Sequence, residues 1–430
     1  MRILTVLGLI GLLAACSPAE HETPAPAVDA AAPVLEAEDW PLPAPDGAAQ
    51  ADLVRAPDGD LLLSWLEPDA GGHALFFSRW AADAWSGRRQ IARGSDWFVN
   101  WADFPHILAT ADGALWAHWL QKSAAATYAY DVALVRSVDQ GGSWSVPVLV
   151  NDDGTPTEHG FVSLWPAGSD GIGIAWLDGR EMAHTPDAPP AAGREGHAAH
   201  GGAMTLRAAR FDAGLQRLDE VRIDGRVCDC CQTAVAITDR GPLLLYRDRG
   251  PGEIRDIAAA RLEDGAWTGL GTVHDDGWEM RACPVNGPAV AASGKDVVAA
   301  WYTAAGGTPQ VRLARSADAG DRFDLPLIVD EGEAVQGRVD VVLTAGAAWV
   351  LWLREEAGRQ SLWLARYGAG QGDPAKVELA TLQGRGRGTG FPHLVADGDG
   401  VRAVWTEVAG GIPTLRGARV RVAQGPPANG

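Results

Sequence analysis

The sequence predicts an all-β fold, a β-propeller of seven four-stranded blades, with six or eight blades as the alternative counts. An apolar segment that ends in an aromatic residue recurs at seven places along the chain. A second apolar segment, which ends in arginine, follows each of them, and in four of the seven copies the two residues are 14 positions apart. A repeat of about 50 residues with several short strands is typical of propeller blades. No segment shows a sustained helical period of apolar residues.

Each repeat unit can be divided into strands. The second strand ends at the aromatic residue and the third at the arginine, with a first strand before them and a less regular fourth strand after them. The seven pairs are Trp65 and Arg79, Trp119 and Arg136, Trp176 and Arg210, Tyr246 and Arg261, Trp301 and Arg315, Trp352 and Arg366, and Trp405 and Arg419. The last copy ends after its third strand, near Val422. We expect the segment from Val34 to Trp40 to supply the missing outer strand, because ring closure removes exposed sheet edges.

The N-terminus has the features of a secretory signal. A short positive start precedes an apolar run from Ile3 to Leu13, which is too short to span a membrane. The following Leu13-Ala14-Ala15-Cys16 resembles the lipobox of bacterial lipoproteins, which implies cleavage before Cys16, lipidation of its thiol, and an outer-membrane anchor because Ser17 follows. The expected organisation is a signal peptide at 1–15, a lipidated Ala/Pro-rich tether at 16–33, the propeller at 34–423 and a disordered tail at 424–430.

Two segments carry a known turn motif. Residues 137–144 (Ser-Val-Asp-Gln-Gly-Gly-Ser-Trp) and 316–323 (Ser-Ala-Asp-Ala-Gly-Asp-Arg-Phe) each follow a predicted third strand. They resemble the Asp box of the sialidase-like propellers, also called BNR repeats. In this turn the aspartate accepts backbone N–H groups and glycine adopts the required positive φ. The resemblance implies the fold across nearly the whole mature chain, but the box itself is a structural turn found with many activities.

Composition limits the partners. The formal net charge is −19, which argues against nucleic acid because binding to it requires a basic surface. Five cysteines are present, and Cys16 is assigned to lipidation, so four remain in a chain predicted to enter an oxidising compartment. The membrane, through the lipid anchor, and a small-molecule or glycan ligand are the expected partners.

Propeller topology places the links between blades and the loops between second and third strands on one face. The unusual residues of this chain fall in those segments, so we expect the site there. Guanidinium groups bind carboxylates and phosphates bidentately, and aromatic rings pack on sugars. The ligand-binding candidates are Arg247, Arg249, Arg255, Trp101 and Trp278, although the Arg/Asp run from 247 to 256 also fits a salt-bridged surface.

The four remaining cysteines have two interpretations. Cys228, Cys230 and Cys231 lie in one predicted link and Cys283 in the next, so two structural disulfides are the first interpretation. The second is a copper or zinc site, because soft thiolates and imidazole suit these ions. Weak further ligand candidates are His184, His197 and His200, which lie in an Ala/Gly/Pro-rich insertion that also fits a solvated loop. No cofactor is certain from the sequence.

The resemblance to sialidases does not extend to their catalytic residues. The family uses three arginines on the substrate carboxylate, a tyrosine nucleophile paired with glutamate, and an aspartate as acid and base. The early arginine element is absent, and no tyrosine follows Tyr367. The weak catalytic candidates are Asp103, Arg255, Arg338 and Arg387. We therefore expect a propeller that binds a small anionic or glycan ligand, with a sialidase-like glycosidase and a Cys/His metal-binding protein as the alternatives.

Overall fold

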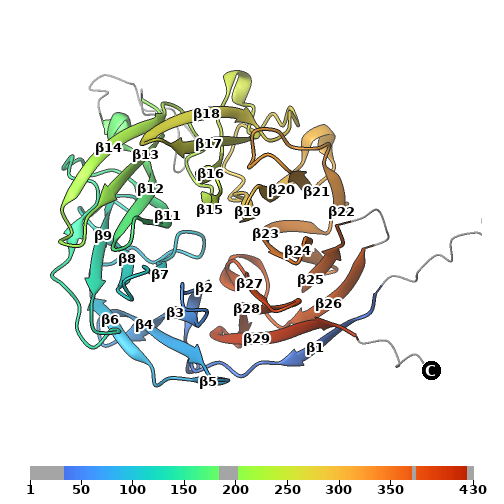
Figure 1. Ribbon diagram of the computed structural model, residues 1–430, viewed down its shortest axis with the longest axis horizontal. Coiled ribbons are helices and arrows are strands. Elements are labelled where there is room, and N and C mark those ends of the chain that lie inside the picture. Colours follow the sequence, from blue (N-terminus) through green and yellow to red (C-terminus); the bar gives the residue numbers. More distant parts are fainter. Residues whose placement is uncertain (1–32, 184–201, 370–373, 424–430) are drawn as a thin grey trace, which may run out of the picture.

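The computed structural model describes residues 33–183, 202–369 and 374–423 of this chain. Seven antiparallel sheets are arranged around a central axis, with their first strands innermost (Figure 1). The predicted all-β, seven-bladed propeller is therefore confirmed, and six blades is excluded. The predicted signal peptide with Cys16, nearly all of the tether, and the tail lie outside the described residues. In the part that the structure describes, no helix is long and apolar enough to span a bilayer.

The blades follow one another in chain order. The first three consist of β2 (Ala49–Arg55), β3 (Leu61–Asp69), β4 (Gly72–Ala81), β5 (Ala84–Trp85) and β6 (Arg89–Gly94); β7 (Ile107–Ala109), β8 (Leu115–Lys122), β9 (Tyr130–Ser137) and β10 (Val148–Leu149); and β11 (His159–Ala167), β12 (Gly171–Asp178), β13 (Thr205–Phe211) and β14 (Arg217–Asp224). The next three consist of β15 (Ala234–Thr238), β16 (Gly241–Arg247), β17 (Ile257–Glu263) and β18 (Ala266–Thr272); β19 (Ala289–Ser293), β20 (Asp296–Thr303), β21 (Gln310–Ser316) and β22 (Leu327–Glu331); and β23 (Val335–Thr344), β24 (Ala347–Glu356), β25 (Arg359–Tyr367) and β26 (Ala375–Leu382). Short 3-10 helices occupy loops at Arg180–Ala183, Pro251–Glu253, Ala305–Gly307 and Gly386–Thr389.

The two ends of the described chain close the ring. The seventh blade is formed by β27 (His393–Asp397), β28 (Gly400–Ala409), β29 (Ile412–Val422) and the N-terminal strand β1 (Leu35–Asp39). β1 pairs antiparallel with β29, from Leu35 opposite Val422 to Asp39 opposite Ala418, so the blue and red ends lie side by side (Figure 1). The outer strand expected from the Val34–Trp40 segment is confirmed.

The Asp boxes lie where the resemblance predicts, at the turns from β9 to β10 and from β21 to β22. In the first box Asp139 accepts hydrogen bonds from the N–H and the hydroxyl of Ser143, at 2.8 and 2.7 Å. In the second box Asp318 accepts from the N–H of Arg322 at 3.0 Å. The box aromatic Trp144 packs edge-to-face on Phe77 of the preceding blade. The two Asp boxes thus occupy the turns between the third and fourth strands of their blades.

The core lies between blades. Each second strand continues beyond the aromatic residue that was predicted to end it, and each third strand continues beyond its arginine. The seven aromatic residues are all buried, and apolar clusters join neighbouring blades. Several indole N–H groups find carboxylates, as in Trp176 to Asp178 at 2.7 Å and Trp352 to Asp330 at 2.7 Å. These bonds satisfy the polar atom of an otherwise buried ring.

Bulges interrupt three of the inner strands near their first residues. β2, β11 and β23 each shift register there, and each bulge contains a residue with positive φ: Gln50 (54°), Phe161 (52°) and Arg338 (52°). Such backbone is strained for residues other than glycine and is common beside functional sites, where a bulge redirects a side chain. The three bulges lie at the same end of the inner strands, so side chains at this end of the central axis are candidates for a functional site.

Candidate functional site

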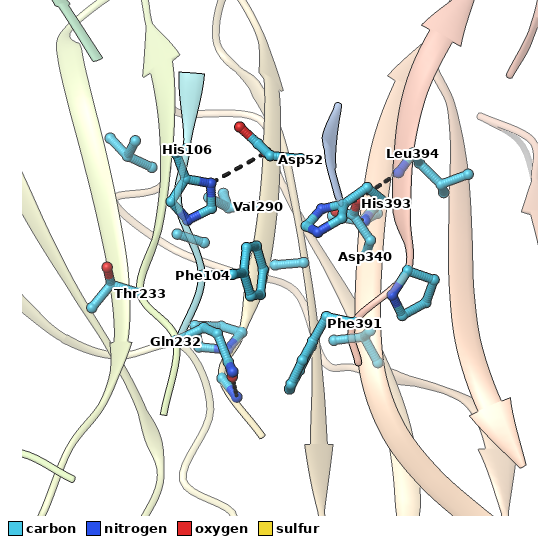
Figure 2. Close-up of a pocket in the computed structure, with 18 of the residues that line it drawn as sticks. Asp52, Phe104, His106, Gln232, Thr233, Val290, Asp340, Phe391, His393 and Leu394 are labelled. Carbon is cyan, nitrogen blue, oxygen red and sulfur yellow. Dashed lines mark hydrogen bonds and ion pairs between the residues drawn. The ribbon is translucent and has the colours of Figure 1, made fainter. Parts of the chain in front are cut away.

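A cavity of about 320 Å³ lies among the starting ends of the inner strands. Its wall includes Phe104 and Phe391 together with two histidine–aspartate pairs, as Figure 2 shows. The cavity occupies the centre of the propeller at the end where the links between blades enter. We call this end the channel mouth.

The two histidine–aspartate pairs are related by the repeat. Asp52 of the first blade accepts the N–H of Ile107 at 2.9 Å, and its other oxygen lies 3.2 Å from Nδ1 of His106. Asp340 of the sixth blade accepts the N–H of Leu394 at 2.7 Å and lies 3.8 Å from Nδ1 of His393. Both histidines follow Phe-Pro at the start of an inner strand. Each aspartate therefore fastens its blade to the next one and also presents a carboxylate to the cavity.

The two aspartates have opposite pKa shifts. Burial alone raises the pKa of Asp52, but the charge and hydrogen bond of His106 lower it below its ordinary value overall. Burial raises the pKa of Asp340 to about 7 despite two backbone N–H bonds. Burial lowers the pKa of His393 to about 4, and its Nε2 has no hydrogen-bond partner among the described residues. The cavity wall thus carries the ionised carboxylate of Asp52 and that of Asp340, which titrates near neutrality. The predicted catalytic candidate Asp103 also lines the cavity.

An aromatic and cationic group lies beside the cavity. Trp101 stacks on Phe391, with 5.8 Å between ring centres. The guanidinium carbon of Arg338 lies 4.6 Å from the Trp101 ring centre and that of Arg387 lies 5.8 Å from it. Burial lowers the pKa of Arg338 to about 10, although the charge of Glu355 acts to raise it; the charge of Arg387 lowers it further. We call Trp101, Phe391, Arg338 and Arg387 the Trp101 cluster; it unites three residues predicted for the site.

The Gln232 side chain spans the mouth. Its Nε2 donates to Ala102 O at 2.6 Å, and its Oε1 accepts from Gly287 N at 3.1 Å. Ala102 belongs to the link before the second blade and Gly287 to the link before the fifth, so one side chain ties distant parts of the ring. Gln232 also lines the cavity, as seen below Phe104 in Figure 2.

The predicted arginine clamp is engaged within the protein. The guanidinium of Arg247 donates to the carbonyls of Asn286, Arg255 and Tyr302, and it lies 4.9 Å from the buried ring of Trp278. Arg249 pairs with Glu253 at 2.9 Å and Asp229 at 3.3 Å, and Arg255 pairs with Glu253 at 2.8 Å. This is the salt-bridged alternative for the 247–256 run, in which protein oxygens accept from all three arginines.

The structure confirms one disulfide, between Cys230 and Cys283. Cys228 and Cys231 are buried free thiols whose Sγ atoms are 3.2 Å apart, so the second predicted disulfide is not formed here. Burial raises the pKa of Cys228 well above its ordinary value. Burial also acts to raise that of Cys231, but the Cys228 thiol, Arg247 and the Asn286 N–H lower it to about 7. The histidines proposed as further ligands, His184, His197 and His200, lie outside the described residues.

Asp103 belongs to a buried acidic triad that the sequence did not reveal. The Tyr130 hydroxyl donates to Glu158 at 2.7 Å and lies 3.2 Å from Asp103. Burial raises the pKa of Asp103 to about 7 and that of Glu158 to about 8. Tyr130 is fully buried and stacks on Phe98 at 4.0 Å. A tyrosine beside two acids resembles the catalytic residue types of sialidases. However, Tyr130 and Glu158 are not among the residues that line the cavity.

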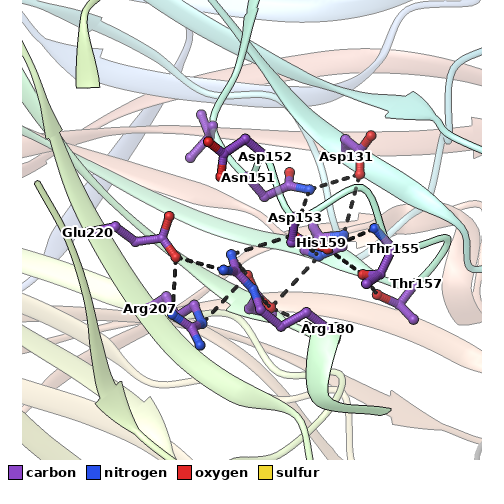
Figure 3. A network of polar contacts seen from close by, with 12 residues as sticks. Asp131, Asn151, Asp152, Asp153, Thr155, Thr157, His159, Arg180, Arg207 and Glu220 are labelled. Carbon is purple, nitrogen blue, oxygen red and sulfur yellow. Dashed lines mark hydrogen bonds and ion pairs between the residues drawn. The ribbon is translucent and has the colours of Figure 1, made fainter. Parts of the chain in front are cut away.

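A second polar cluster lies between the second and third blades (Figure 3). His159 contacts Asp153 at 3.1 Å and Asp178 at 3.8 Å, which are spacings that a metal ion also uses. However, the Arg180 guanidinium lies 2.7 Å from Asp178 and 3.5 Å from Asp153. These charges neutralise one another, so we interpret the cluster as structural support for the third blade.

The sequence did not identify three acidic residues of these sites, because single aspartates and glutamates are common on strands: Asp52, Asp340 and Glu158. One sequence feature pointed to this site: Phe-Pro-His occurs twice, at 104–106 and 391–393. Because both copies occupy the same position in the blade repeat, the repeat alone could account for their similarity. What the repeat does not indicate is that each histidine meets the aspartate of the preceding blade.

No family model and no curated protein matches this sequence. Among solved structures, the chain is similar to an α-L-arabinofuranosidase from Fusarium graminearum, with 13% identity over 91% of this chain and 97% of that chain and a TM-score of 0.47. It is also similar to a Trypanosoma rangeli sialidase (12% identity, 78% and 56% of the two chains, TM-score 0.43) and to a polysaccharide lyase, an ulvan lyase (10% identity, 76% and 80%, TM-score 0.45). Likenesses this distant carry no argument about the reaction.

Proposed function

We propose that this chain is a propeller lipoprotein of the cell envelope that binds a small anionic ligand, a carboxylate-bearing sugar, at the channel mouth. The observation that carries the proposal is the free cationic edge of the Trp101 cluster. Nη1 of Arg338 is bound by protein oxygens, but no described residue accepts from its Nε or Nη2. Among the described residues neither Arg338 nor Arg387 forms an ion pair with a carboxylate, and the charge of Glu355 acts on Arg338 from beyond ion-pair distance.

The chemistry of the cluster fits this class of ligand. A guanidinium edge with two parallel N–H groups matches a carboxylate. The neighbouring rings of Trp101, Phe391 and Phe104 run from the cluster to the cavity and offer apolar faces to a sugar ring. Small-molecule sites combine an apolar wall with a few polar groups in this way. The cavity below supplies imidazole and carboxylate partners for hydroxyl groups.

Calorimetric titration of the purified chain tests this proposal. The ligands are N-acetylneuraminic acid, glucuronic acid and galacturonic acid, with glucose and galactose as neutral counterparts. We expect at least one acid to bind and the neutral sugars not to bind. Arg387→Ala should weaken binding about tenfold, the loss of ~1.4 kcal/mol.

The matched control is Arg322→Ala, which removes an exposed arginine from the Asp-box face. It should leave the affinity unchanged. Equal binding of neutral and acidic sugars, absence of binding by every acid, or an unchanged affinity in Arg387→Ala would reject the proposal.

Hydrolysis of an acidic glycoside is a second candidate function, favoured by one observation. Asp52 and Asp340 share one cavity while their environments push their pKa values in opposite directions. Such a pair suits a general acid (Asp340) and a general base (Asp52). Fluorogenic sialosides and uronides provide the assay, and Asp340→Asn should lower any turnover at least about 100-fold. Complete inactivity of the unmodified protein across both panels would leave only the binding function.

A further inference from the structure

The two free cysteines form a closely spaced pair in the link between the third and fourth blades. Cys228 and Cys231 are 1% and 2% exposed, and their Sγ atoms are 3.2 Å apart. The third cysteine of the segment, Cys230, is bound to Cys283 of the next link, with its sulfur 4.0 Å from that of Cys228. The disulfide therefore fixes the segment that carries the pair.

The pair lies in an apolar cluster, but several polar groups are directed at it. The Cys228 N–H donates to Arg247 O at 3.0 Å, which holds the segment against the end of β16. The Asn286 N–H donates to the Cys231 sulfur, and the positive charges of Arg247 and Arg255 act on it. Both guanidinium groups are themselves held by protein oxygens, Arg247 by three carbonyls and Arg255 by Glu253 and Met280 O. These fixed donors favour an anionic sulfur centre.

We propose that Cys228 and Cys231 bind one copper(I) ion through both sulfurs while the Cys230–Cys283 disulfide stays intact. Binding forms two copper–sulfur bonds, releases two thiol protons and changes no oxidation state. The resulting bis-thiolate centre carries one net negative charge, which Arg247 and Arg255 balance. Since a metal–thiolate bond is about 2.3 Å long, the two sulfurs must move apart from 3.2 Å when the ion enters, by rotation of the side chains.

The donor set favours copper(I) over zinc. Structural zinc takes four nitrogen or sulfur ligands in a tetrahedron. In the described part of the chain, Cys230 is the one further candidate ligand grouped with Cys228 and Cys231, and its sulfur is already bonded to Cys283. Copper(I) prefers soft thiolates and is satisfied by two of them. The centre lies in the same apolar cluster as Trp101 and Phe391, next to the proposed ligand site but using none of its groups.

The test uses the full chain with Cys16→Ser, so that four cysteines remain, purified without chelators and handled without oxygen. Thiol titration of the unfolded protein should give two free thiols. Competition with the chromophoric chelator bicinchoninate should show one copper(I) per chain. Cys228→Ser and Cys231→Ser should each weaken copper binding at least about 100-fold. The matched control, the double variant Cys230→Ser with Cys283→Ser, lacks the disulfide and should still bind copper.

A second readout does not depend on the stability of the variants. Copper should protect Cys228 and Cys231 of the otherwise unmodified chain from N-ethylmaleimide, as mapped by mass spectrometry. Three results would overturn the proposal. The first is a protein that has no free thiol and binds no copper after mild reduction. The others are an unchanged affinity for copper in both serine variants and a zinc ion bound by four thiolates. None of these results would affect carboxylate binding, which is measured without metal.

Discussion

The guanidinium of Arg338 lies over the ring of Trp101, with its carbon 4.6 Å from the ring centre, although β23 of the sixth blade carries Arg338 and the link before the second blade carries Trp101. Nη1 of the same guanidinium is held by Gly386 O at 2.9 Å and Thr389 Oγ1 at 3.0 Å, in the link to the last blade. One side chain thus joins three segments at the channel mouth. Arg387, over the same ring, is exposed and has no such bonds to the described chain.

This difference predicts separable effects of two substitutions. Arg387→Ala should weaken carboxylate binding and leave the free energy of unfolding within about 0.5 kcal/mol of the parent, as is usual at exposed positions. Arg338→Ala should abolish binding and also destabilise the fold by about 3 kcal/mol, because it removes several charge-assisted hydrogen bonds and buried packing. Urea unfolding and calorimetric titration of both variants check the prediction. Equal loss of stability in the two would contradict it.

Stability should depend on pH through the buried acids Asp103 and Glu158. Burial raises their pKa values to about 7 and about 8, whereas in the unfolded chain such groups titrate near pH 4. Above about pH 4 the folded protein keeps protons on these two acids that the unfolded chain releases. Their contribution to the free energy of unfolding is therefore complete below about pH 4 and is lost as the pH rises through 7 to 8. We expect the free energy of unfolding to fall between about pH 4 and pH 8.

Glu158→Gln should reduce this pH dependence, because glutamine still accepts from the Tyr130 hydroxyl but does not titrate. The slope should flatten by up to about 1 kcal/mol per pH unit. Glu38→Gln, an exposed substitution on β1, is the control and should keep the parental slope. Urea titrations at several pH values provide the measurement, and a slope in Glu158→Gln equal to that of the parent would show that Glu158 ionises freely.

The sequence predicted the fold because each blade repeats its own local signals. The aromatic residue of the second strand and the Asp box after the third strand depend only on neighbouring residues. Trp176 is buried within β12, and Asp139 accepts from the N–H of Ser143 as the box requires. Ring closure by β1 was also predictable, since the last repeat lacked an outer strand and the first had a spare one.

The site was less predictable because it depends on which blades meet. Arg247 ends β16 and Arg387 lies in a 3-10 helix of the link to the last blade. Only the structure shows that three carbonyls accept from Arg247, whereas Arg387 forms no ion pair with the described residues. The pairing of Asp52 with His106 likewise crosses a blade boundary. Such contacts depend on the bulges of the inner strands, which no local pattern of this sequence indicates.

The disulfide should contribute strongly to stability. Cys230 and Cys283 are 53 residues apart, and closing a loop of that length stabilises a fold by about 4 kcal/mol in the chain-entropy account. The double variant Cys230→Ala with Cys283→Ala should therefore unfold at clearly lower urea concentration than the parent. Dithiothreitol should produce a similar loss in the parent and none in the variant. A variant as stable as the parent would mean that the links are held by their hydrogen bonds alone.

Gly337, which precedes Arg338 in the bulge of β23, should tolerate no side chain. Its φ is +73°, and a Cβ there would lie 2.5 Å from Asn286 Oδ1 and 2.8 Å from Tyr302 Cβ. Gly346, in the turn from β23 to β24, has a similar φ of +78°, but a Cβ there would meet only Ala369 at 3.5 Å.

Both alanine variants, Gly337→Ala and Gly346→Ala, share the strain of positive φ, about 1 kcal/mol. Gly337→Ala should lose at least about 1 kcal/mol more, because Asn286 must shift and then no longer holds the Arg338 N–H. It should also lose carboxylate binding, whereas Gly346→Ala should keep it. Equal unfolding midpoints in the two variants would show that the bulge does not position Arg338.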